Sequence, residues 1–268
     1  APAASRPHGS GDGAFRSLPG GLSELIRALV AALPADRIHL GQRVAGVTRD
    51  GQQYRVRTES GMTVTGDALV LATPAFATAK YIRSFDAQIA DRCGAIPYAS
   101  AATVSLAFPR EAISHPLNGS GFVVPKAENT GILAGSWLSS KWPGRAPAGK
   151  VLLRTFLGGA RDPRALELSD AEMVERSLQA LTPLIGIVGP PLFTRVYRWE
   201  NANAQHEVGH LDRVRAIEAA VNVHPGLYIT GSGYRGVGIP DCVADGRAVG
   251  RQVSEWLTTS GFSAVSAQ

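Results

Sequence analysis

The sequence predicts an α/β protein in which one α/β domain is interrupted by an inserted α+β domain built on an antiparallel sheet. Three observations support this prediction. An early helical pattern gives way to short segments of period-two alternation. A middle block contains strand-sized apolar segments separated by Gly- and Pro-rich turns. The last part returns to helical patterns around one short apolar strand. We place the inserted domain at residues 77–200, between residues 1–76 and 201–268.

The first part is expected to hold a helix and a β-meander. The segment GGLSELIRALVAALP has apolar residues at helical spacing, and Pro34 ends the pattern. Turns at Asp50-Gly51 and Ser60-Gly61 then separate alternating segments typical of strands. The run ALVLATP, residues 68–74, is apolar without alternation, which favours a strand buried on both faces.

The same kinds of pattern predict the helices and strands of the middle and last parts of the chain. Residues 77–95 have a helical pattern, and a strand is expected over residues 97–108. The segments SGFVVP, TGILAGSWLSS and KVLLRTFLGG indicate further strands. A helix follows with Ser169 and Glu172 spaced as a capping box. The strand FTRVYRWENA, the helix GHLDRVRAIEAAVNVHPG and a final helix opened by Pro240 complete the chain.

Composition excludes several classes of protein. The chain is 44% hydrophobic and 18% charged, which is ordinary for a folded protein and argues against disorder. The net charge of +5 gathers in no polybasic run, so we expect no nucleic-acid partner, although an anionic ligand or membrane surface is compatible with it. Cys93 and Cys242 match no metal or redox spacing and fit a reducing compartment. No apolar run is long enough to span a bilayer, and the first residues lack the apolar region of a signal peptide. We therefore expect a cytoplasmic protein.

Two motif matches are interpreted as accidental. HEVGH, residues 206–210, fits the H-E-x-x-H pattern of zinc proteases. Gly209 disfavours the required helix by about 1 kcal/mol relative to Ala, and Ala216 stands where the longer pattern needs a third His. GSGDGA, residues 9–14, fits a phosphate-loop pattern but follows no strand, so we expect coil there.

The glycine-rich segment LYITGSGYRGVGIPDCVADGRAVG, residues 227–250, raises the question of a cofactor. Gly231, Gly233 and Gly236 spell G-x-G-x-x-G after a strand, but only 18 residues follow Gly250, too few for a further βαβ unit. Glycines let the backbone approach a ligand closely, and the positive end of the final helix would stabilise an anion formed there. A glycine-rich turn without a ligand is the alternative that the residues leave open.

This segment resembles the C-terminal flavin motif of the oxygen-dependent protoporphyrinogen and coproporphyrinogen oxidases, within the flavin amine oxidase superfamily. The resemblance spans about residues 15–257 and includes, in order, FRSLPGGLSELIRALVAAL, RVAGVTRDGQQYRV, ALVLATPAFATAK, VLLRTFLGGARDP and WENANAQHEVGHLDRV. It implies part of an FAD-binding domain of the glutathione-reductase type, over residues 1–76 and 201–268, with an inserted substrate domain. It also implies the flavin-dependent oxidation of a porphyrinogen to the porphyrin by O2, in heme biosynthesis.

The resemblance implies particular site residues. The implied FAD contacts are Val44 at the adenine side, Trp199 near the flavin, Gly231 and Ser232 at the ribityl-phosphate side, and Val237, Gly238 and Ile239 against the ring. The implied contacts to the flat macrocycle are Val123, Trp137 and Phe156, and apolar and aromatic side chains suit such a ligand. No side-chain nucleophile and no metal are implied.

The sequence departs from the family pattern in three places. Residues 203–206 read NAQH, where the family often has Met-Pro-Gln-Tyr, and Ser232 replaces the usual Asn. The initial strand with its glycine-rich loop for the ADP pyrophosphate has no counterpart, so we expect a C-terminal portion that binds FAD poorly in isolation. Two alternatives stay open: another oxidoreductase of the flavin amine oxidase type, or an inactive fragment that needs a partner for its missing half. Peripheral membrane association, the oligomeric state and the choice between protoporphyrinogen and coproporphyrinogen are not settled by the sequence.

Overall fold

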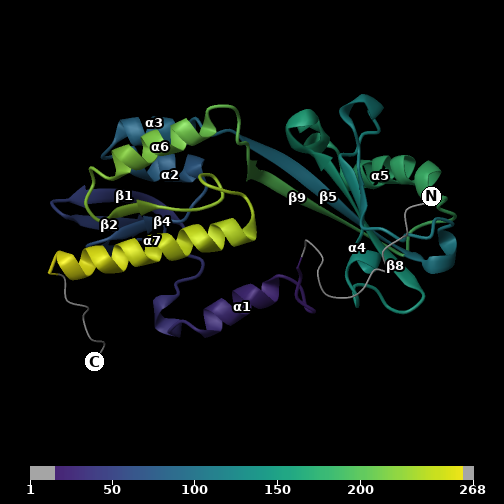
Figure 1. The fold of residues 1–268 in the computed structure, drawn as a ribbon, viewed down its shortest axis with the longest axis horizontal. Coiled ribbons are helices and arrows are strands. Elements are labelled where there is room, and N and C mark those ends of the chain that lie inside the picture. The colour runs from purple at the N-terminus through teal and green to yellow at the C-terminus, as the bar shows by residue number, and fades with distance from the viewer. Residues whose placement is uncertain (1–15, 262–268) are drawn as a thin grey trace, which may run out of the picture.

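The computed structural model describes residues 16–261, which form two lobes with separate hydrophobic cores (Figure 1). Two long strands, β5 (Tyr98–Pro109) and β9 (Phe193–Ala204), run from the second lobe towards the first and connect them. Short 3-10 helices lie at Ala35–Arg37, Arg110–Ala112, Lys126–Glu128, Gly159–Arg161 and Pro163–Glu167. The space between the lobes is therefore bounded by elements from both.

The first lobe contains the predicted meander and a short parallel pair of strands. Strands β1 (Val44–Asp50), β2 (Gln53–Thr58) and β3 (Thr63–Gly66) form an antiparallel sheet in that order. Strand β4 (Leu69–Leu71) pairs in parallel with β10 (Leu227–Ile229). Leu71 is buried but Val70 is 42% exposed, so the expectation of a strand buried on both faces is wrong for Val70.

Helices complete this lobe. They are α2 (Ala75–Ile82), α3 (Ala87–Gly94), α6 (His210–Val221) and α7 (Ile239–Thr259). Ile82 and Ile89 are fully buried in one core with Ile217 and Leu227. Residues of α2 and α3 thus pack with the first lobe, whereas we expected the inserted domain to begin at residue 77. The functional assignment of residues 1–76, 77–200 and 201–268 stays a prediction.

The second lobe is built on a five-stranded antiparallel sheet in the order β6-β7-β8-β5-β9. Its remaining strands are β6 (Gly121–Val123), β7 (Ala134–Trp137) and β8 (Lys150–Gly158), and the short helix α4 (Leu138–Lys141) follows β7. Helix α5 (Asp170–Ile185) covers one face of the sheet, where alternate residues such as Val104, Leu106 and Leu153 are fully buried. The predicted capping box is confirmed: the Ser169 amide donates to Glu172 Oε2 at 2.7 Å, and Ser169 Oγ accepts from the Glu172 amide.

Helix α1 (Ser23–Ala31) forms as predicted but buries none of its residues. Its apolar side is exposed together with its flanking residues: Leu22, Ile26, Leu29, Val30 and Leu33. Amphipathic helices normally gain their stability by packing this face. The described part of the chain therefore leaves an apolar helix face without a cover.

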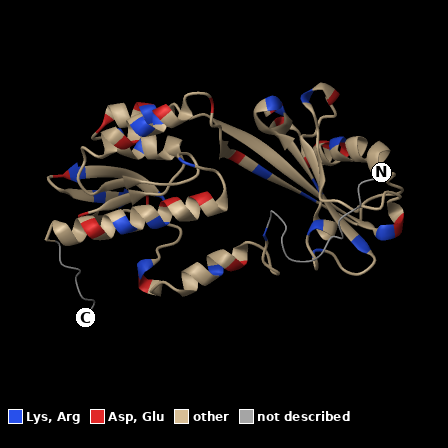
Figure 2. Cartoon of the chain, in the orientation of Figure 1, with Lys and Arg blue, Asp and Glu red and all other residues tan. Residues whose placement is uncertain are grey.

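The distribution of charged residues and the hydropathy of the helices agree with the expectations from the sequence. Acidic and basic residues are interspersed over the helices of both lobes (Figure 2). Within residues 16–261, none of the helices combines the length and apolar character needed to cross a bilayer.

Candidate active site

One face of the second-lobe sheet is free of α5 and carries an aromatic surface, which we call the platform: Phe156, Thr103, Tyr197 and Trp199. The register places Thr103 opposite both Phe156 on β8 and Tyr197 on β9, so the three side chains share this face. Trp199 Nε1 donates to Thr103 Oγ1 at 3.5 Å. Tyr197 and Trp199 are 56% and 47% exposed, so the surface can receive a flat ligand.

Val123 extends the platform across two strands. It pairs with Ala134, which in turn pairs with Phe156 in the same row, and Val123 is 77% exposed. The structure thus brings together Val123 and Phe156, two of the three residues that the resemblance assigned to substrate contact.

Trp137 lies on the opposite face, so its predicted position beside the macrocycle is not supported. Strand side chains alternate between faces, and Ala134 and Ser136 of β7 already take the platform side. Trp137 is 4% exposed and packs on Phe122 and His115, with ring centroids 5.5 and 6.1 Å away. It is a core residue of the second lobe.

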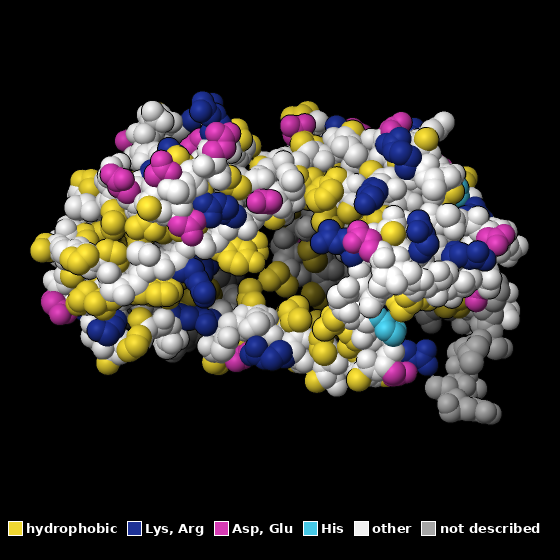
Figure 3. Space-filling model, turned by 180° about the vertical axis from the view of Figure 1, so that it is seen from behind, with side chains coloured by type: hydrophobic (Ala, Val, Ile, Leu, Met, Phe, Trp, Pro, Cys, Tyr) yellow, Lys and Arg dark blue, Asp and Glu magenta, His cyan; other side chains and the backbone are white. Residues whose placement is uncertain are grey.

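Exposed apolar side chains flank the start of α7. Gly238 is the N-cap and offers no side-chain cap, so the first amides of this 21-residue helix carry its positive dipole end. Val237 and Ile239 are 62% and 48% exposed on either side of it. Helix α7 points this end towards the second lobe in Figure 1, and Figure 3 shows a hollow between the lobes with hydrophobic and basic side chains at its rim.

The glycines before α7 serve two purposes. A Cβ on Gly233 would lie 2.4 Å from Tyr98 Oη, and a Cβ on Gly236 would lie 2.7 Å from Asp241 Cβ. These two glycines are therefore required by contacts within the chain itself. Gly231 has φ 131°, which favours glycine, and a Cβ there would meet nothing closer than Thr73 O at 3.8 Å. Of these three glycines, only Gly231 has open space where a Cβ would lie.

Val44 and Ser232 are the two other predicted cofactor contacts. Val44 lies far from the start of α7 in the sequence, and both residues are only partly exposed. Val44 opens β1 at an irregularity in its register and is partly buried. Ser232 is partly buried in the loop after β10, next to Gly231. Their roles as FAD contacts stay predictions.

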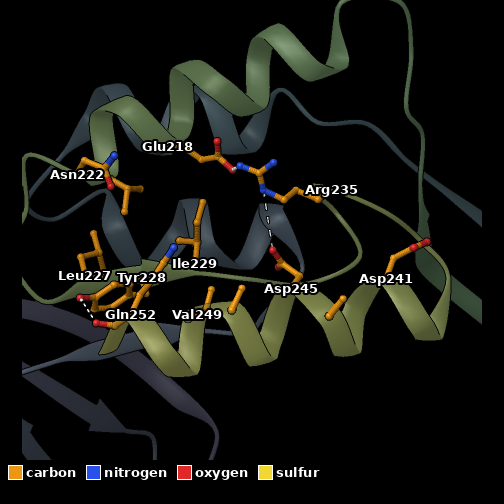
Figure 4. Close-up of a pocket in the computed structure, with 13 residues that line it drawn as sticks. Glu218, Asn222, Leu227, Tyr228, Ile229, Arg235, Asp241, Asp245, Val249 and Gln252 are labelled. Carbon is orange, nitrogen blue, oxygen red and sulfur yellow. Dashed lines mark hydrogen bonds and ion pairs between the residues drawn. The ribbon is translucent and has the colours of Figure 1, made fainter. Parts of the chain in front are cut away.

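Ion pairs and a hydrogen bond connect α6, α7 and the segment that follows β10 in the first lobe. Arg235 pairs with Glu218 of α6 at 2.5 Å and with Asp245 of α7 at 3.9 Å. Thr230 Oγ1 donates to Asp245 Oδ2 at 2.5 Å. Glu218, Arg235 and Asp245 line a pocket of about 550 Å³ that lies over β10 between α6 and α7 (Figure 4). Within residues 16–261, β10 is paired only with β4, so its other edge is free.

The HEVGH segment does not form the helix that a zinc protease needs. Helix α6 begins at His210, so His206 and Glu207 precede it. His210 is 4% exposed, and its Nε2 lies 2.7 Å from Tyr234 O. His210 therefore supports the glycine-rich loop. The GSGDGA segment lies outside the described residues.

Burial also decides the protonation state of two groups, the thiol of Cys93 and the phenol of Tyr234 in the glycine-rich loop. Cys93 is fully buried, and desolvation raises its pKa to about 11, so it stays a thiol at neutral pH. Burial likewise raises the pKa of Tyr234, the residue between Gly233 and Arg235. Neither group is a candidate nucleophile.

Comparison with known proteins decides the family. Residues 5–254 match the family described as flavin containing amine oxidoreductase. The chain belongs to the flavin-containing amine oxidoreductases. This is the superfamily that the glycine-rich segment indicated, and its mixed α/β fold with antiparallel sheets is the one observed here.

Several relatives of this chain have assigned activities. Coproporphyrinogen III oxidase of Bacillus subtilis (strain 168) is 33% identical over 94% of this chain and 54% of its own length. Chloroplastic protoporphyrinogen oxidase of Oryza sativa subsp. japonica is 27% identical over 96% of this chain and 50% of its own. The crystal structure of a protein assigned as a protoporphyrinogen oxidase from Exiguobacterium sp. 255-15 superposes with a TM-score of 0.79 at 28% identity, covering 88% of this chain and 51% of that one. The chain thus spans about half the length of the relatives it matches.

Sequence reasoning missed part of the platform and two arginines on the same face of the sheet. Tyr197 and Thr103 join Trp199 and Phe156, and Arg154 and Arg195 lie on the same face. The alternation in FTRVYRW was the available signal, because it places Arg195, Tyr197 and Trp199 on one side of a strand.

Proposed function

We propose that this chain supplies the substrate platform and the ring-facing helix of a flavin-dependent porphyrinogen oxidase, which uses O2 to convert protoporphyrinogen IX or coproporphyrinogen III into the porphyrin. The observation that carries the proposal is the platform of Phe156, Tyr197 and Trp199 on the face free of α5. A broad aromatic surface favours a flat macrocycle, and aromatic side chains stack well on such rings.

We infer that the cofactor is FAD and that its ring lies at the start of α7. Val237 and Ile239 would contact the ring through apolar side chains, and the uncapped amides at Gly238 would stabilise negative charge on it. Trp199, Gly231, Ser232 and Val44 are the further proposed FAD contacts. When bound, the flavin supplies the electron-accepting chemistry and its reoxidation by O2, while the protein positions the macrocycle and excludes water.

The proposed function includes a second half that completes the cofactor site. We define the unmatched half as the part of the relatives that this chain does not cover, whether it is supplied in the same polypeptide or by another. The exposed apolar face of α1 and the free edge of β10 in the pocket between α6 and α7 support docking of such a polypeptide. A strand added beside β10 would extend the parallel pair of β4 and β10.

A different oxidoreductase of the amine oxidase type is the second candidate, and the breadth of the family favours it. The two candidates differ in the charge of their substrates, since an amine is cationic and a porphyrinogen carries carboxylates. An inactive fragment is the remaining alternative. The expectations of a cytoplasmic location and of peripheral membrane contact stay predictions.

Reconstitution tests the proposal. The chain is expressed with the unmatched half of the Bacillus subtilis relative, and flavin content, porphyrin fluorescence and hydrogen peroxide are measured. We expect bound FAD, porphyrin formed from coproporphyrinogen III, and peroxide released in proportion. Flavin binding with oxidation of amines but not of porphyrinogens would favour the second candidate, and a complex without flavin would favour the inactive fragment.

A further inference from the structure

We propose that Arg154 and Arg195 form a carboxylate-binding row beside the platform, and that this row holds the propionate groups of a tetrapyrrole whose ring lies on the aromatic side chains. The inference rests on the proposed function and adds a substrate subsite to it.

Sheet geometry places both arginines on the platform face. Ser105 of β5 pairs with Arg154 of β8 on one side and with Arg195 of β9 on the other. Directly opposed residues of an antiparallel sheet point to the same face, so the three side chains form one row. Ser136 of β7 extends the row beyond Arg154.

This row runs alongside the aromatic one. Arg154 and Phe156 are two residues apart on β8, and Arg195 and Tyr197 are two residues apart on β9. Two residues along a strand correspond to about 7 Å, and two strand spacings separate the arginine backbones by about 10 Å. A macrocycle on the aromatic row therefore has both guanidinium groups within reach of the side chains at its edge.

Neither arginine has a partner within the described chain. Among residues 16–261, none of the hydrogen bonds or ion pairs involves the guanidinium of Arg154 or Arg195, and Arg154 Nε is buried without a hydrogen-bond acceptor. Arg198 provides a contrast on the same strand. It faces α5, pairs with Asp170 at 2.5 Å and donates to Leu168 O at 2.7 Å.

Arg154 is partly buried, and an unpaired guanidinium in such a position is costly, whereas Arg195 is exposed. The Arg154 end of the row therefore favours an anionic ligand, and Arg195 adds a second positive charge beside it. Desolvation lowers the pKa of Arg154, but the group stays charged at neutral pH. Guanidinium groups bind carboxylates in a planar, charge-assisted geometry, and the Ser105 hydroxyl can donate a further hydrogen bond, whereas the Ser136 hydroxyl already donates to Ser120 O. The same charges repel a cationic amine, which separates this subsite from an amine-oxidising one.

The test uses coproporphyrin III and its tetramethyl ester as probes, because they share a ring and differ in their carboxylates. Affinity for the 268-residue chain is measured by fluorescence titration in one detergent-containing buffer. The variants are Arg154→Met and Arg195→Met, which keep an apolar stem without the charge. Arg198→Met is the matched control on the other face of β9.

We expect each of the two variants to bind coproporphyrin III about tenfold more weakly, and the ester as well as the wild type does. The Arg198→Met control should bind both probes as the wild type does. Arg154→Lys should recover part of the affinity, and circular dichroism melting identifies any variant that fails to fold. Equal binding of the acid by the wild type and both Met variants overturns the subsite, as does an equal loss for acid and ester.

The reconstituted enzyme separates failure of the subsite from failure of the proposed function. If both Met variants keep the wild-type KM for coproporphyrinogen III while the enzyme remains active, the subsite is wrong and the function stands. If the wild type neither binds coproporphyrin III nor oxidises the porphyrinogen, both are wrong. A variant that loses stability in the reconstituted enzyme without a change in KM would show that an acidic residue of the unmatched half pairs with it, which also overturns the subsite.

Discussion

The indole of Trp199 lies against the phenol ring of Tyr197, with ring centroids 4.4 Å apart and planes inclined by 44°. Both rings are about half exposed on the face of β9 that α5 does not cover. Exposed aromatic pairs of this size usually mark a binding surface, because a soluble chain gains little by leaving them in water. The pair defines where we expect the macrocycle to bind.

Replacing Trp199 or Tyr197 by Ala should weaken binding of coproporphyrin III about three- to tenfold, because each ring would stack on the macrocycle. Since both rings are half exposed, the free energy of unfolding should change by less than about 1 kcal/mol. Fluorescence titration and urea unfolding measure the two effects. Leu184→Ala is the control, because Leu184 is 53% exposed on α5 and away from the platform. An affinity equal to that of the wild type would remove these rings from the site.

Trp137→Ala should lower the free energy of unfolding by about 3–5 kcal/mol, since it empties a buried position between Phe122 and His115. Folded Trp137→Phe, the milder variant, should bind coproporphyrin III as the wild type does. Urea unfolding and titration test both statements. A stable Trp137→Phe protein with strongly reduced affinity would return Trp137 to the substrate site.

Asp86 should contribute stability that disappears in acid. Its Oδ1 accepts from the Ile89 amide at 2.8 Å as the N-cap of α3, and its Oδ2 lies 2.8 Å from His224 Nε2. Burial acts to raise the pKa of Asp86, but these hydrogen bonds and the charge of His224 lower it below the ordinary value. A depressed folded-state pKa stabilises the protein above the unfolded-state pKa, about 3.9, and the benefit is lost as the pH falls through the folded-state value.

Asp86→Asn should therefore cost about 1–2 kcal/mol at neutral pH, and the difference from the wild type should shrink below about pH 4. Urea unfolding across this pH range measures the difference. Asp91→Asn, which removes an exposed ion pair to Arg83, should change stability by less than about 1 kcal/mol throughout. A deficit for Asp86→Asn that is independent of pH would contradict the linkage.

The two cysteines should react at different rates. Cys93 is fully buried with a pKa raised to about 11, whereas Cys242 is partly exposed in the first turn of α7, with Sγ 3.5 Å from Gly236 O. In the folded chain we expect a thiol reagent to modify Cys242 and to spare Cys93 until urea is added. Peptide mapping identifies the site. In the reconstituted enzyme, bound FAD should slow modification of Cys242, and unchanged labelling would argue against a ring at the start of α7.

Local patterns predicted most elements of the fold. Alternation in residues 97–108 gave β5, and the Ser169–Glu172 spacing gave the start of α5. The face of the sheet to which each strand side chain points was harder to predict, because a shift of one residue moves a side chain to the other face. The resemblance implied a macrocycle contact for Trp137, but the alternation along β7 turns its side chain into the core. Val70 was expected to be buried, but within residues 16–261 the pair of β4 and β10 leaves its side chain 42% exposed.

The site was predictable only where the residues are close in sequence. The uncapped start of α7 and its exposed Val237 follow from the local order of glycines and Pro240. Arg154 gained significance only when the sheet placed it beside Ser105, a residue 49 positions earlier and paired through the register. The role of His210 as a support for the Tyr234 carbonyl likewise depends on a tertiary contact.

Anaerobic reduction of the flavin in the reconstituted enzyme tests the central claim most directly, namely that the platform and the start of α7 hold a porphyrinogen against the flavin ring. Coproporphyrinogen III is mixed with the wild type and with Val237→Glu, at matched flavin content, and the absorbance of oxidised flavin is followed. We predict rapid bleaching in the wild type, at least about tenfold slower bleaching in the variant, and none with a primary amine. Equal rates in both proteins, or bleaching by the amine but not by the porphyrinogen, would contradict the account.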